Sequence, residues 1–380
     1  MKYLKEICIV TANQLENENP ARNRILSLVN GFLKKEYTVH LISMDHDDYQ
    51  ICSDHNFIHH KIPFINVKIS SFFKRAYLEM KIALNAIKKA NQIDCELSLV
   101  TIPSMFLLHL SFLFKGDRRK ILDIRDLSWE YLSDKSFIQR IAKQIFRISA
   151  YRNLRNFNFI DVTNEQELEY VKSIVPNIPL FKMSNGVSER IYNQLSSLPK
   201  SRKEEVIVTY IGNIGLAQDL STLIKASEML TEIQFNIVGH GTDFHRISGL
   251  VNKDQCNIKF WGQVDFETLK SVYIETDILY AQLTPEFSGA MPSKLYEYLS
   301  TGKYIIYGGD NVAVNILNNF DNISIIEAQN VQKLVSTLKD IKDKELYKIS
   351  SLSNQKKIYN EFVRERSVEA FINYIESGSK

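Results

Sequence analysis

Short apolar runs rich in β-branched residues alternate with helical patterns along almost the whole 380-residue chain. Helical periodicity is clearest at residues 22–35, 73–90 and 137–154. In the first half we expect strands at residues 7–11, 38–42, 97–102, 120–124, 159–163 and 180–183. Strands that alternate with helices in this way form a parallel sheet with helices on both faces. The pattern therefore predicts an α/β fold.

The alternation pauses once, at residues 194–205, where the sequence reads QLSSLPKSRKEE. Ser, Pro and charged residues cluster there without an apolar period, which is typical of a linker. Strands are expected to resume at residues 206–211, 235–238, 258–261, 278–281, 304–307 and 323–325. We therefore predict two doubly wound domains, residues 1–195 and 204–360, with a C-terminal helix at 361–380 packing back toward the first. Such sheets bind ligands at the carboxyl ends of their strands, so we expect an interdomain cleft to hold a small molecule.

The composition is that of an ordinary globular protein, with 44% apolar and 24% charged residues. The four cysteines are scattered without a CxxC pair, which favours free thiols in a reducing compartment. The first residues, MKYLKEICIVTAN, have too short an apolar run for a signal peptide, so we expect a cytoplasmic protein. Residues 97–114 carry no formal charge, but Pro103 interrupts them, which favours a buried strand and helix over a membrane span.

Positive charge is concentrated in the first half of the chain. Residues 1–200 contain 28 Lys or Arg against 21 Asp or Glu, whereas the remainder contains 19 against 23. Within this half, residues 134–156 combine six bases and one acid with Ile and Phe at helical spacing. This combination predicts a helix that contacts an anionic membrane surface, through bases that include Lys135, Arg140, Lys143 and Arg147. The alternative is a surface helix whose apolar face packs in the core. Nucleic acid is not expected, because the bases do not interleave with aromatic residues along a groove.

Glycines follow three successive strands of the second half, namely Gly212 and Gly215, Gly239 and Gly241, and Gly262. Glycine lets a backbone approach a ligand closely, although any one of them is explained equally well by a tight turn. Their recurrence favours a binding edge. None completes a G-x-G-x-x-G pattern, which argues against a nicotinamide dehydrogenase.

The stretch TPEFSGAMPSKLYEYLSTGK, residues 284–303, predicts a small-residue loop feeding a helix. Pro292 suits the first turn of that helix and Gly302 suits its end. Free N–H groups at such a helix start favour a phosphate, and Lys294 adds a positive charge. Glu297 lies one turn further, and its two oxygens can accept hydrogen bonds from a ribose diol. An ordinary i,i+3 surface pair of Lys294 and Glu297 explains the same spacing equally well.

In the first half, Asp126 follows an expected strand and is our candidate for a polar group near the reacting centre. A strand-end ion pair, with Arg125 or beside Glu130, is the alternative. The polar stretch 13–24 carries Arg22 and Arg24, which could close over phosphates. Two further patterns are interpreted as carrying no metal. One is the group Cys52, His55, His59 and His60, whose segment is expected to be strand or loop, and the other is the triplet 45–47, expected in a loop.

These residues resemble the GT-B glycosyltransferases, specifically the family-4 group of bacterial retaining enzymes. The resemblance is carried by YIGNIGLAQDLSTLIKA (210–226), FNIVGHGTD (235–243), IKFWGQVDFETLKSVYIETDILYAQL (258–283) and SKLYEYLSTGKYII (293–306), with KILDIRDLSWE (120–130) and MSNGVS (183–188) in the first half. Within this group the chain is similar to N-acetylfucosaminyl transferases of O-antigen and capsule assembly. The resemblance implies two Rossmann-like domains, no bound metal and no cofactor.

The resemblance also implies roles for individual residues. Glu297 would hold the donor ribose, backbone around 262–264 would hold the base, and Lys294 with the loop 288–290 would hold the diphosphate. Asp126, Lys294 and Glu297 are thus the expected catalytic residues. The full expected donor set is Gly212, Asn213, Gly215, Gln218, Gly239, Gly241, Gly262, Val264, Glu286, Ser288, Gly289, Ala290, Lys294 and Glu297.

The sequence departs from the family pattern in two places. The first glutamate of the E-x7-E motif is replaced by Gly289, with Glu286 nearby but out of register. Asn213 and Gln218 replace an Arg and a Lys that the family places near the donor sugar and phosphates. An unusual donor such as an N-acetylated deoxy-amino sugar on UDP is therefore expected. The expected acceptor is a saccharide or lipid-linked, at the inner face of the cytoplasmic membrane. A non-catalytic nucleotide-sugar-binding paralogue and a sugar-nucleotide 2-epimerase remain alternatives.

Overall fold

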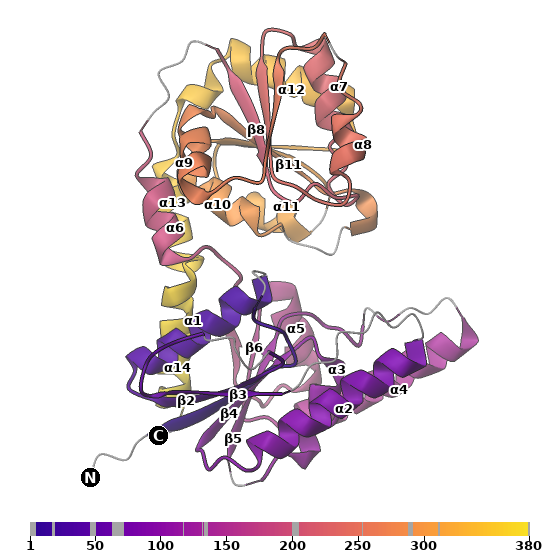
Figure 1. Ribbon diagram of the computed structural model, residues 1–380, viewed down its shortest axis with the longest axis vertical. Coiled ribbons are helices and arrows are strands. Elements are labelled where there is room, and N and C mark those ends of the chain that lie inside the picture. The colour runs from indigo at the N-terminus through magenta and orange to yellow at the C-terminus, as the bar shows by residue number, and fades with distance from the viewer. Residues whose placement is uncertain are drawn as a thin grey trace. The chain divides into compact units, whose positions relative to one another are not determined.

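The computed structural model describes residues 5–16, 20–45, 51–62, 72–116, 118–130, 132, 136–199, 205–252, 254–287, 292–310 and 312–378. The chain divides into two compact units (Figure 1). The first unit is Met1–Asn185 together with Arg364–Lys380, and the second is Gly186–Val363. Each unit contains its own parallel sheet, as expected for two doubly wound α/β domains.

The described part of the first unit holds a seven-stranded parallel sheet in the order β3-β2-β1-β4-β5-β6-β7. Its strands are β1 (Glu6–Val10), β2 (Thr38–Ser43), β3 (Phe57–Lys61), β4 (Leu97–Ile102), β5 (Arg119–Ile124), β6 (Phe159–Val162) and β7 (Leu180–Lys182). Its helical segments are α1 (Pro20–Lys34), α2 (Phe72–Ala90), α3 (Met105–His109), η1 (Ser111–Leu113), α4 (Phe137–Leu154), α5 (Glu165–Ile174) and α14 (Arg364–Ser377).

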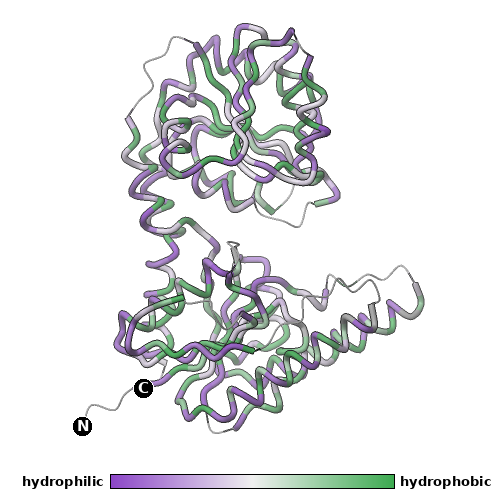
Figure 2. Tube along the Cα trace, in the orientation of Figure 1, coloured by the Kyte–Doolittle hydropathy of each residue, from purple (hydrophilic) through white to green (hydrophobic). Residues whose placement is uncertain are grey.

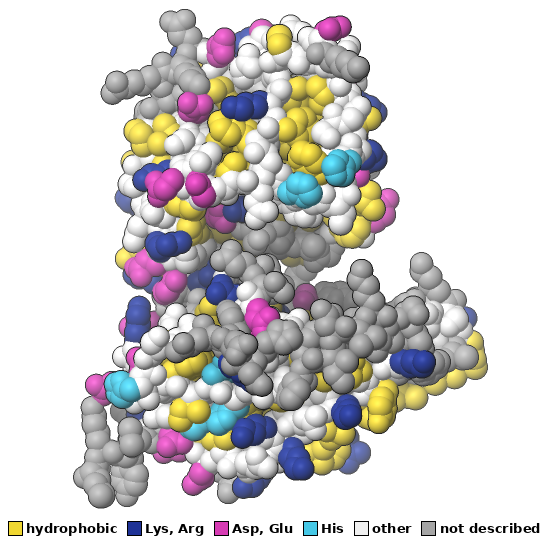
Figure 3. All heavy atoms as spheres, viewed as in Figure 1, with side chains coloured by type: hydrophobic (Ala, Val, Ile, Leu, Met, Phe, Trp, Pro, Cys, Tyr) yellow, Lys and Arg dark blue, Asp and Glu magenta, His cyan; other side chains and the backbone are white. Residues whose placement is uncertain are grey.

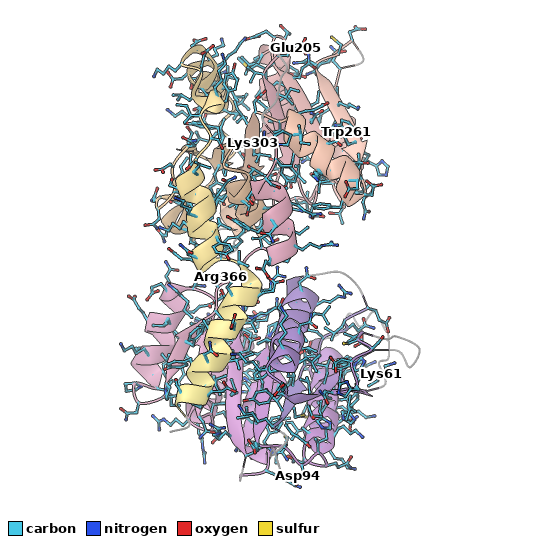
Figure 4. All side chains as sticks on the ribbon, turned by 90° about the vertical axis from the view of Figure 1, so that its left-hand side faces the viewer. Lys61, Asp94, Glu205, Trp261, Lys303 and Arg366 are labelled. Atoms are coloured by element: carbon cyan, nitrogen blue, oxygen red, sulfur yellow. The ribbon has the colours of Figure 1, made fainter. Side chains whose placement is uncertain are left out.

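The sheet of the first unit is covered on both faces. Alternate side chains of β1 enter different cores, since Ile7 and Ile9 pack with α1 and α14, whereas Cys8 and Val10 pack with α2, α3 and α4. This is the two-residue period of a strand buried on both sides. Helix α14, which carries the Arg366 labelled in Figure 4, packs closely on α1. A Cβ on Gly31 of α1 would lie only 2.3 Å from the Val368 side chain of α14.

The described part of the second unit holds a six-stranded parallel sheet in the order β10-β9-β8-β11-β12-β13. Its strands are β8 (Ile207–Ile211), β9 (Gln234–Val238), β10 (Ile258–Gly262), β11 (Ile278–Gln282), β12 (Tyr304–Gly308) and β13 (Ile323–Ile326). Its helical segments are α6 (Glu189–Ser196), α7 (Ser221–Met229), α8 (Phe244–Ser248), α9 (Phe266–Glu275), η2 (Pro285–Phe287), α10 (Lys294–Thr301), α11 (Val312–Leu317), α12 (Val331–Asp343), η3 (Leu346–Lys348) and α13 (Leu352–Glu361). One core lies under α7 and α12, and the other lies under α9, α10 and α13.

The strands expected from the sequence are all present, with small shifts at their ends. For the segment of strand β3 the sequence did not distinguish strand from loop, because FIHHK lacks an apolar run, and the structure shows a strand at the edge of the sheet. The predicted linker also differs from the structure. Residues 194–196 complete α6, which Ser188 caps and whose Tyr192 and Leu195 are buried in the second unit. The division between the units therefore falls before α6, at 185–186, rather than at 195.

The uncharged stretch 97–114 forms β4, α3 and η1. Among the residues that the structure describes, no helix is long and apolar enough to cross a membrane.

Candidate functional site: the carboxyl edge of the second sheet

The order of strands in the second unit creates a switch point between β8 and β11. These two strands are neighbours, and the chain proceeds outward from them in opposite directions, to β9 and β10 on one side and to β12 and β13 on the other. Loops that leave the carboxyl ends of such neighbouring strands diverge and leave room for a ligand between them. The described members of the expected donor set lie at the carboxyl ends of β8, β9, β10 and β11 and on α10.

The loops after β8 and β9 are packed backbone against backbone. Gly212 N donates to Val238 O (3.0 Å), and Ile214 N donates to His240 O (3.1 Å). Gly239 has φ +131°, and a Cβ there would lie 1.9 Å from Gly212 O. A Cβ on Gly241 would lie 2.3 Å from Ile214 O. Packing between the two loops therefore requires glycine at both positions. The same packing brings the predicted residues together, and no ligand is needed to explain the two glycines.

Asn213 and Gln218 lie side by side in the loop after β8. Asn213 Nδ2 donates to Gln218 Oε1 (3.4 Å), and Tyr210 Oη donates to Asn213 O (2.6 Å). A Cβ on Gly215 would lie 2.7 Å from Asn213 Nδ2, so this turn is tightly closed. A neutral pair of amides thus occupies this loop.

Gln282, at the end of β11, ties the two sides of the switch point together and was missed by the sequence analysis. Its buried amide donates from Nε2 to the carbonyls of Gln218 and Asp219, both at 3.0 Å. Thr284 N donates to Ala217 O (2.8 Å) two residues further on. The only sequence signal was a polar residue that ends an apolar strand, which is too common to single it out.

Helix α10 runs from Lys294 to Thr301, and Gly302 caps it with a φ of +69°, the left-handed conformation predicted for a helix end. Pro292 lies just before the helix, and its carbonyl accepts a hydrogen bond from Leu295 N (3.1 Å). Tyr298 fixes the helix to the end of β8, since its hydroxyl donates to Ile211 O (3.0 Å) and accepts from Ile211 N (2.8 Å). The expected loop residues Ser288, Gly289 and Ala290 lie outside the described part of the chain.

Lys294 and Glu297 form a bidentate ion pair on α10. Lys294 Nζ lies 2.9 Å from Glu297 Oε1 and 2.8 Å from Oε2, and the two side chains are 35% and 22% exposed. Tyr273, buried on α9, donates from its hydroxyl to Glu297 Oε2 (3.3 Å). Burial and the Glu297 carboxylate raise the pKa of Tyr273 well above its usual value, which keeps the hydroxyl protonated as a donor. The i,i+3 pair expected as the alternative interpretation is thus present, and its carboxylate is also held by a third residue.

The neighbouring expected residues are placed as follows. Gly262 ends β10 with φ +67° and open space where a Cβ would lie, and its carbonyl accepts a hydrogen bond from Gly239 N (2.8 Å). Val264 packs partly buried on the core under α9 and α10. Trp261, labelled in Figure 4, donates from Nε1 to Asn236 Oδ1 (2.9 Å). Glu286 is exposed in η2, and hydrogen bonds from its own backbone and from Thr284 lower its pKa.

A pocket of about 570 Å³ opens beyond the ends of β11, β12 and β13. Its lining includes Thr284 and Pro285 on one side and Gly309, Asp310 and Glu327 on the other. No role was expected for this region, although Gly309 follows β12 in the same way that other glycines follow their strands.

In the first unit, Asp126 follows β5 and is exposed, and it makes no ion pair within 4 Å in the described part of the chain. The surrounding protein raises its pKa, while the neighbouring Arg125 lowers it. Glu130, the other expected partner, instead pairs with Arg147 (3.2 Å) and accepts a short hydrogen bond from Tyr170. Asp126 therefore remains available to a ligand.

Arg24, expected on a phosphate-binding loop, is instead fully buried. Its guanidinium donates to Asp123 (2.9 Å), Asp161 (2.6 Å) and Met183 O (2.7 Å). Asp123 and Asp161 are partners in the register of β5 and β6, so the strands bring two carboxylates side by side. Burial and the Asp123 carboxylate raise the pKa of Asp161. Arg24 is occupied in holding α1 to the sheet and is not free to bind phosphate.

The basic helix predicted at an anionic membrane is α4, for which Lys135 lies outside the described residues. Arg140 is exposed, Lys143 is half-buried, and Arg147 pairs with Glu130. The helix has two apolar faces. Phe146, Ala150 and Leu154 pack in the core, whereas four other large apolar side chains are exposed, namely Phe137 (72%), Ile141 (46%), Ile145 (61%) and Ile148 (67%). The alternative of an ordinary amphipathic helix accounts only for the first face.

Comparison with known proteins shows which family and which folds this chain is similar to. Residues 195–360 match the family described as Glycosyl transferases group 1. No curated protein matches the chain in sequence. Several solved structures are similar over the whole length. Sucrose-phosphate synthase from Thermosynechococcus elongatus has a TM-score of 0.73 at 15% identity and covers 98% of both chains.

A glycosyltransferase from Rickettsia africae has a TM-score of 0.64 at 14% identity and covers 99% of this chain and 98% of its own. Anabaena Alr3699/HepE in complex with UDP and glucose has a TM-score of 0.64 at 13% identity and covers 99% of this chain and all (100%) of its own. At such identities the likeness concerns the fold. Residues 195–360 are therefore similar to the group 1 glycosyl transferases, and the chain has the two-domain GT-B fold.

Proposed function

We propose that the protein transfers a sugar from a nucleotide diphosphate sugar, with UDP favoured, to a saccharide or lipid-linked acceptor. The observation that carries this proposal is the group formed by Lys294, Glu297 and Tyr273, placed on α9 and α10 beside the switch point between β8 and β11. A carboxylate and a cation at the start of a helix are the groups that a ribose diol and a diphosphate require.

Donor binding exchanges the partners of this group. Glu297 gives up the hydrogen bonds from Lys294 and accepts those of the two ribose hydroxyls, while Tyr273 continues to hold Oε2 in place. Because the ion pair is partly exposed, separating it costs little, about 0–1 kcal/mol. Lys294 is then free to neutralise the diphosphate.

Glycosyl transfer leaves negative charge on the departing phosphate. Lys294 and the N-terminus of α10 supply positive charge there, so neither a metal nor a cofactor is required in the proposed mechanism. Removal of one such contact typically costs about 2.7–4 kcal/mol of transition-state stabilisation. We propose that transfer proceeds with retention of configuration, and that Asp126 provides a polar group on the acceptor side.

The donor sugar is proposed to be an N-acetylated deoxy-amino sugar. Asn213 and Gln218 form a neutral amide pair in the loop after β8. An amide side chain offers both a hydrogen-bond donor and an acceptor. It is therefore more complementary to an acetamido group than to a charged phosphate.

The acceptor is proposed to lie at the inner face of the cytoplasmic membrane, as in the assembly of O-antigen or capsule. The support is α4, whose exposed Ile and Phe side chains lie beside basic residues such as Arg140 and Arg152. In Figure 2 hydrophobic and hydrophilic residues alternate along α2 and α4. An apolar stripe between bases is what a helix at an anionic interface needs.

The test is calorimetric titration of the full chain with UDP, GDP and CMP. We expect UDP to bind most tightly, and Glu297→Gln to weaken binding tenfold or more because a neutral amide is a poorer acceptor for the ribose diol. Glu267→Gln is the matched control, since Glu267 is exposed in the first turn of the neighbouring α9 and the same charge is lost.

If no nucleotide binds the folded protein, the proposed donor site is wrong. If UDP binds but no UDP-sugar is consumed in the presence of lipid-linked or saccharide acceptors, the non-catalytic binding alternative takes its place. Conversion of the donor to its 2-epimer without transfer, seen by NMR, would identify the epimerase alternative.

A further inference from the structure

A second pocket, of about 630 Å³, lies in the first unit between α3–η1 and the C-terminal half of α4. Its volume falls in the range of about 300–1,000 Å³ that is usual for small-molecule sites. One wall is apolar and is formed by Phe112, Ile145 and Ile148, and the other wall is polar and includes His109, Ser149 and Arg152.

The polar wall is a connected network of hydrogen bonds. Asn153 Nδ2 donates to the carbonyl of Ser149 (2.8 Å), and Asn156 Nδ2 donates to Asn153 Oδ1 (3.0 Å) and to Ser111 Oγ (3.2 Å). These bonds fix η1 against the end of α4. The pocket is therefore bounded by groups held in place before any ligand arrives, which lowers the entropic cost of binding.

His109 presents an unused donor in this wall. Its ring is 7% exposed, and Nδ1 lies 2.9 Å from Ser149 Oγ. Ser149 Oγ accepts from Asn153 Nδ2 (3.2 Å), and in the tautomer that we assign it donates its own proton to His109 Nδ1. Burial lowers the pKa of His109 to about 4, so the neutral ring carries its proton on Nε2. Nε2 is buried and has no partner in the described part of the chain.

The charge of the pocket is positive. Arg152 is exposed and makes no ion pair within 4 Å with the residues that the structure describes, and none of the lining residues is acidic. A guanidinium with free donors, next to a neutral N–H donor, is complementary to a phosphate.

The apolar wall belongs to a larger exposed surface. Phe112 is 61% exposed, and Ile145 and Ile148 are part of the stripe that continues along α4 to Phe137. Figure 3 shows hydrophobic side chains and Lys or Arg side chains close together over the part of this unit formed by α2 and α4. A ligand for the pocket must therefore be anionic at one end and apolar at the other.

We propose that this pocket binds a single anionic membrane phospholipid, whose phosphate contacts Arg152 beside His109 and whose acyl chains lie on Phe112, Ile145 and Ile148. The inference deepens the proposed membrane contact and rests on it. The bound lipid is not the acceptor, because α4 starts after the carboxyl end of β5 and the pocket lies about 18 Å along the helix from that start. It is a headgroup site that anchors the first unit.

The probe is dihexanoyl phosphatidic acid, used as a monomer and titrated into the full chain while amide NMR shifts or heat are recorded. We expect saturable binding at least tenfold tighter than that of dihexanoyl phosphatidylcholine or of inorganic phosphate. Arg152→Gln is expected to weaken binding tenfold or more. Arg155→Gln is the matched control, since Arg155 caps the same helix but does not line the pocket.

Two results would overturn the proposal. If the wild type and Arg152→Gln bind the lipid equally tightly, Arg152 does not contact its phosphate. If inorganic phosphate binds as tightly as the lipid, the pocket is a site for a free anion and not for a phospholipid. Ile148→Ser supplies a second variant that cannot be confused with misfolding, because this side chain is 67% exposed. It is expected to weaken binding of the lipid and to leave binding of inorganic phosphate unchanged.

Two parallel measurements separate this inference from the proposed function. Ile141→Ser, in the exposed stripe but outside the pocket, is expected to reduce cosedimentation with phosphatidylglycerol vesicles while leaving binding of the short-chain lipid intact. Vesicle binding without short-chain lipid binding would refute the headgroup site alone. Lipid binding in a protein that binds no nucleotide would refute the proposed transferase alone.

Discussion

The carboxyl edges of the two sheets are built on the same strand pattern but from different chemistry. In the first unit, charged side chains meet below the edge, where Arg24 joins Asp123 and Asp161 in full burial. In the second unit, backbone groups meet, and glycines let the loops after β8 and β9 touch directly. Topology thus determines where a site can form, whereas the residue types decide whether that edge stabilises the fold or presents groups to a ligand.

This comparison predicts that the first edge depends most on charge. Arg24→Ala leaves two carboxylates buried without their cation, and we expect the free energy of unfolding to fall by about 3–5 kcal/mol. Urea unfolding followed by circular dichroism measures the change. Lys34→Ala, at the exposed end of the same helix, is the control and should change it by less than about 0.5 kcal/mol. A loss for Arg24→Ala no larger than that of the control would mean that the ion cluster does not stabilise the unit.

The second edge should depend on the absence of a side chain. Gly239→Ala places a Cβ at 1.9 Å from Gly212 O with φ at +131°, so the two loops must separate. We expect a loss of about 3 kcal/mol in stability, together with loss of UDP binding. Gly262→Ala is the matched control, because φ is also positive but the surrounding space is open. Its cost should be near the intrinsic value of about 1–2 kcal/mol. Similar losses for both variants would show that backbone strain, and not loop packing, governs this edge.

The smallest expected effect concerns the hydrogen bond from Tyr273 to the Glu297 carboxylate. Tyr273→Phe removes one neutral hydrogen bond to Glu297, and we expect UDP affinity to fall about threefold to tenfold, corresponding to about 0.5–1.5 kcal/mol. Calorimetric titration measures it, and Tyr77→Phe, on the exposed face of α2, is the control. An unchanged affinity would place Tyr273 outside the site.

Regular structure was the most predictable part of this protein. The buried strands follow from their apolar runs, and the αL end of α10 follows from Gly302, because both signals are local. Strand β3 could not be distinguished from a loop, because its polar sequence becomes a strand only by pairing with β2 at the edge of the sheet. The boundary at 194–205 was misplaced because burial of Tyr192 and Leu195 depends on a tertiary surface that α10 and α13 supply.

The parts of the candidate sites that escaped prediction depend on contacts between distant residues. The role of Arg24 requires the register that aligns Asp123 with Asp161. Tyr273 and Gln282 were missed because their hydroxyl and amide reach the site from neighbouring elements. Helix α4 shows a further limit. Its sequence indicates apolar residues at helical spacing, but only the packing reveals that Phe146 faces the core while Ile145 and Ile148 face outward.

The first unit is discontinuous in the sequence, since its last helix comes after the whole of the second unit. Four side chains of α14, Val368, Phe371, Ile372 and Ile375, are buried in the core over β1 and α1. During synthesis, the second unit is complete at Val363 while that core still lacks a wall. Domains usually fold in the order in which they are made. Here the first unit is the first to be synthesised but the last whose core is completed, because α14 follows the second unit in the sequence.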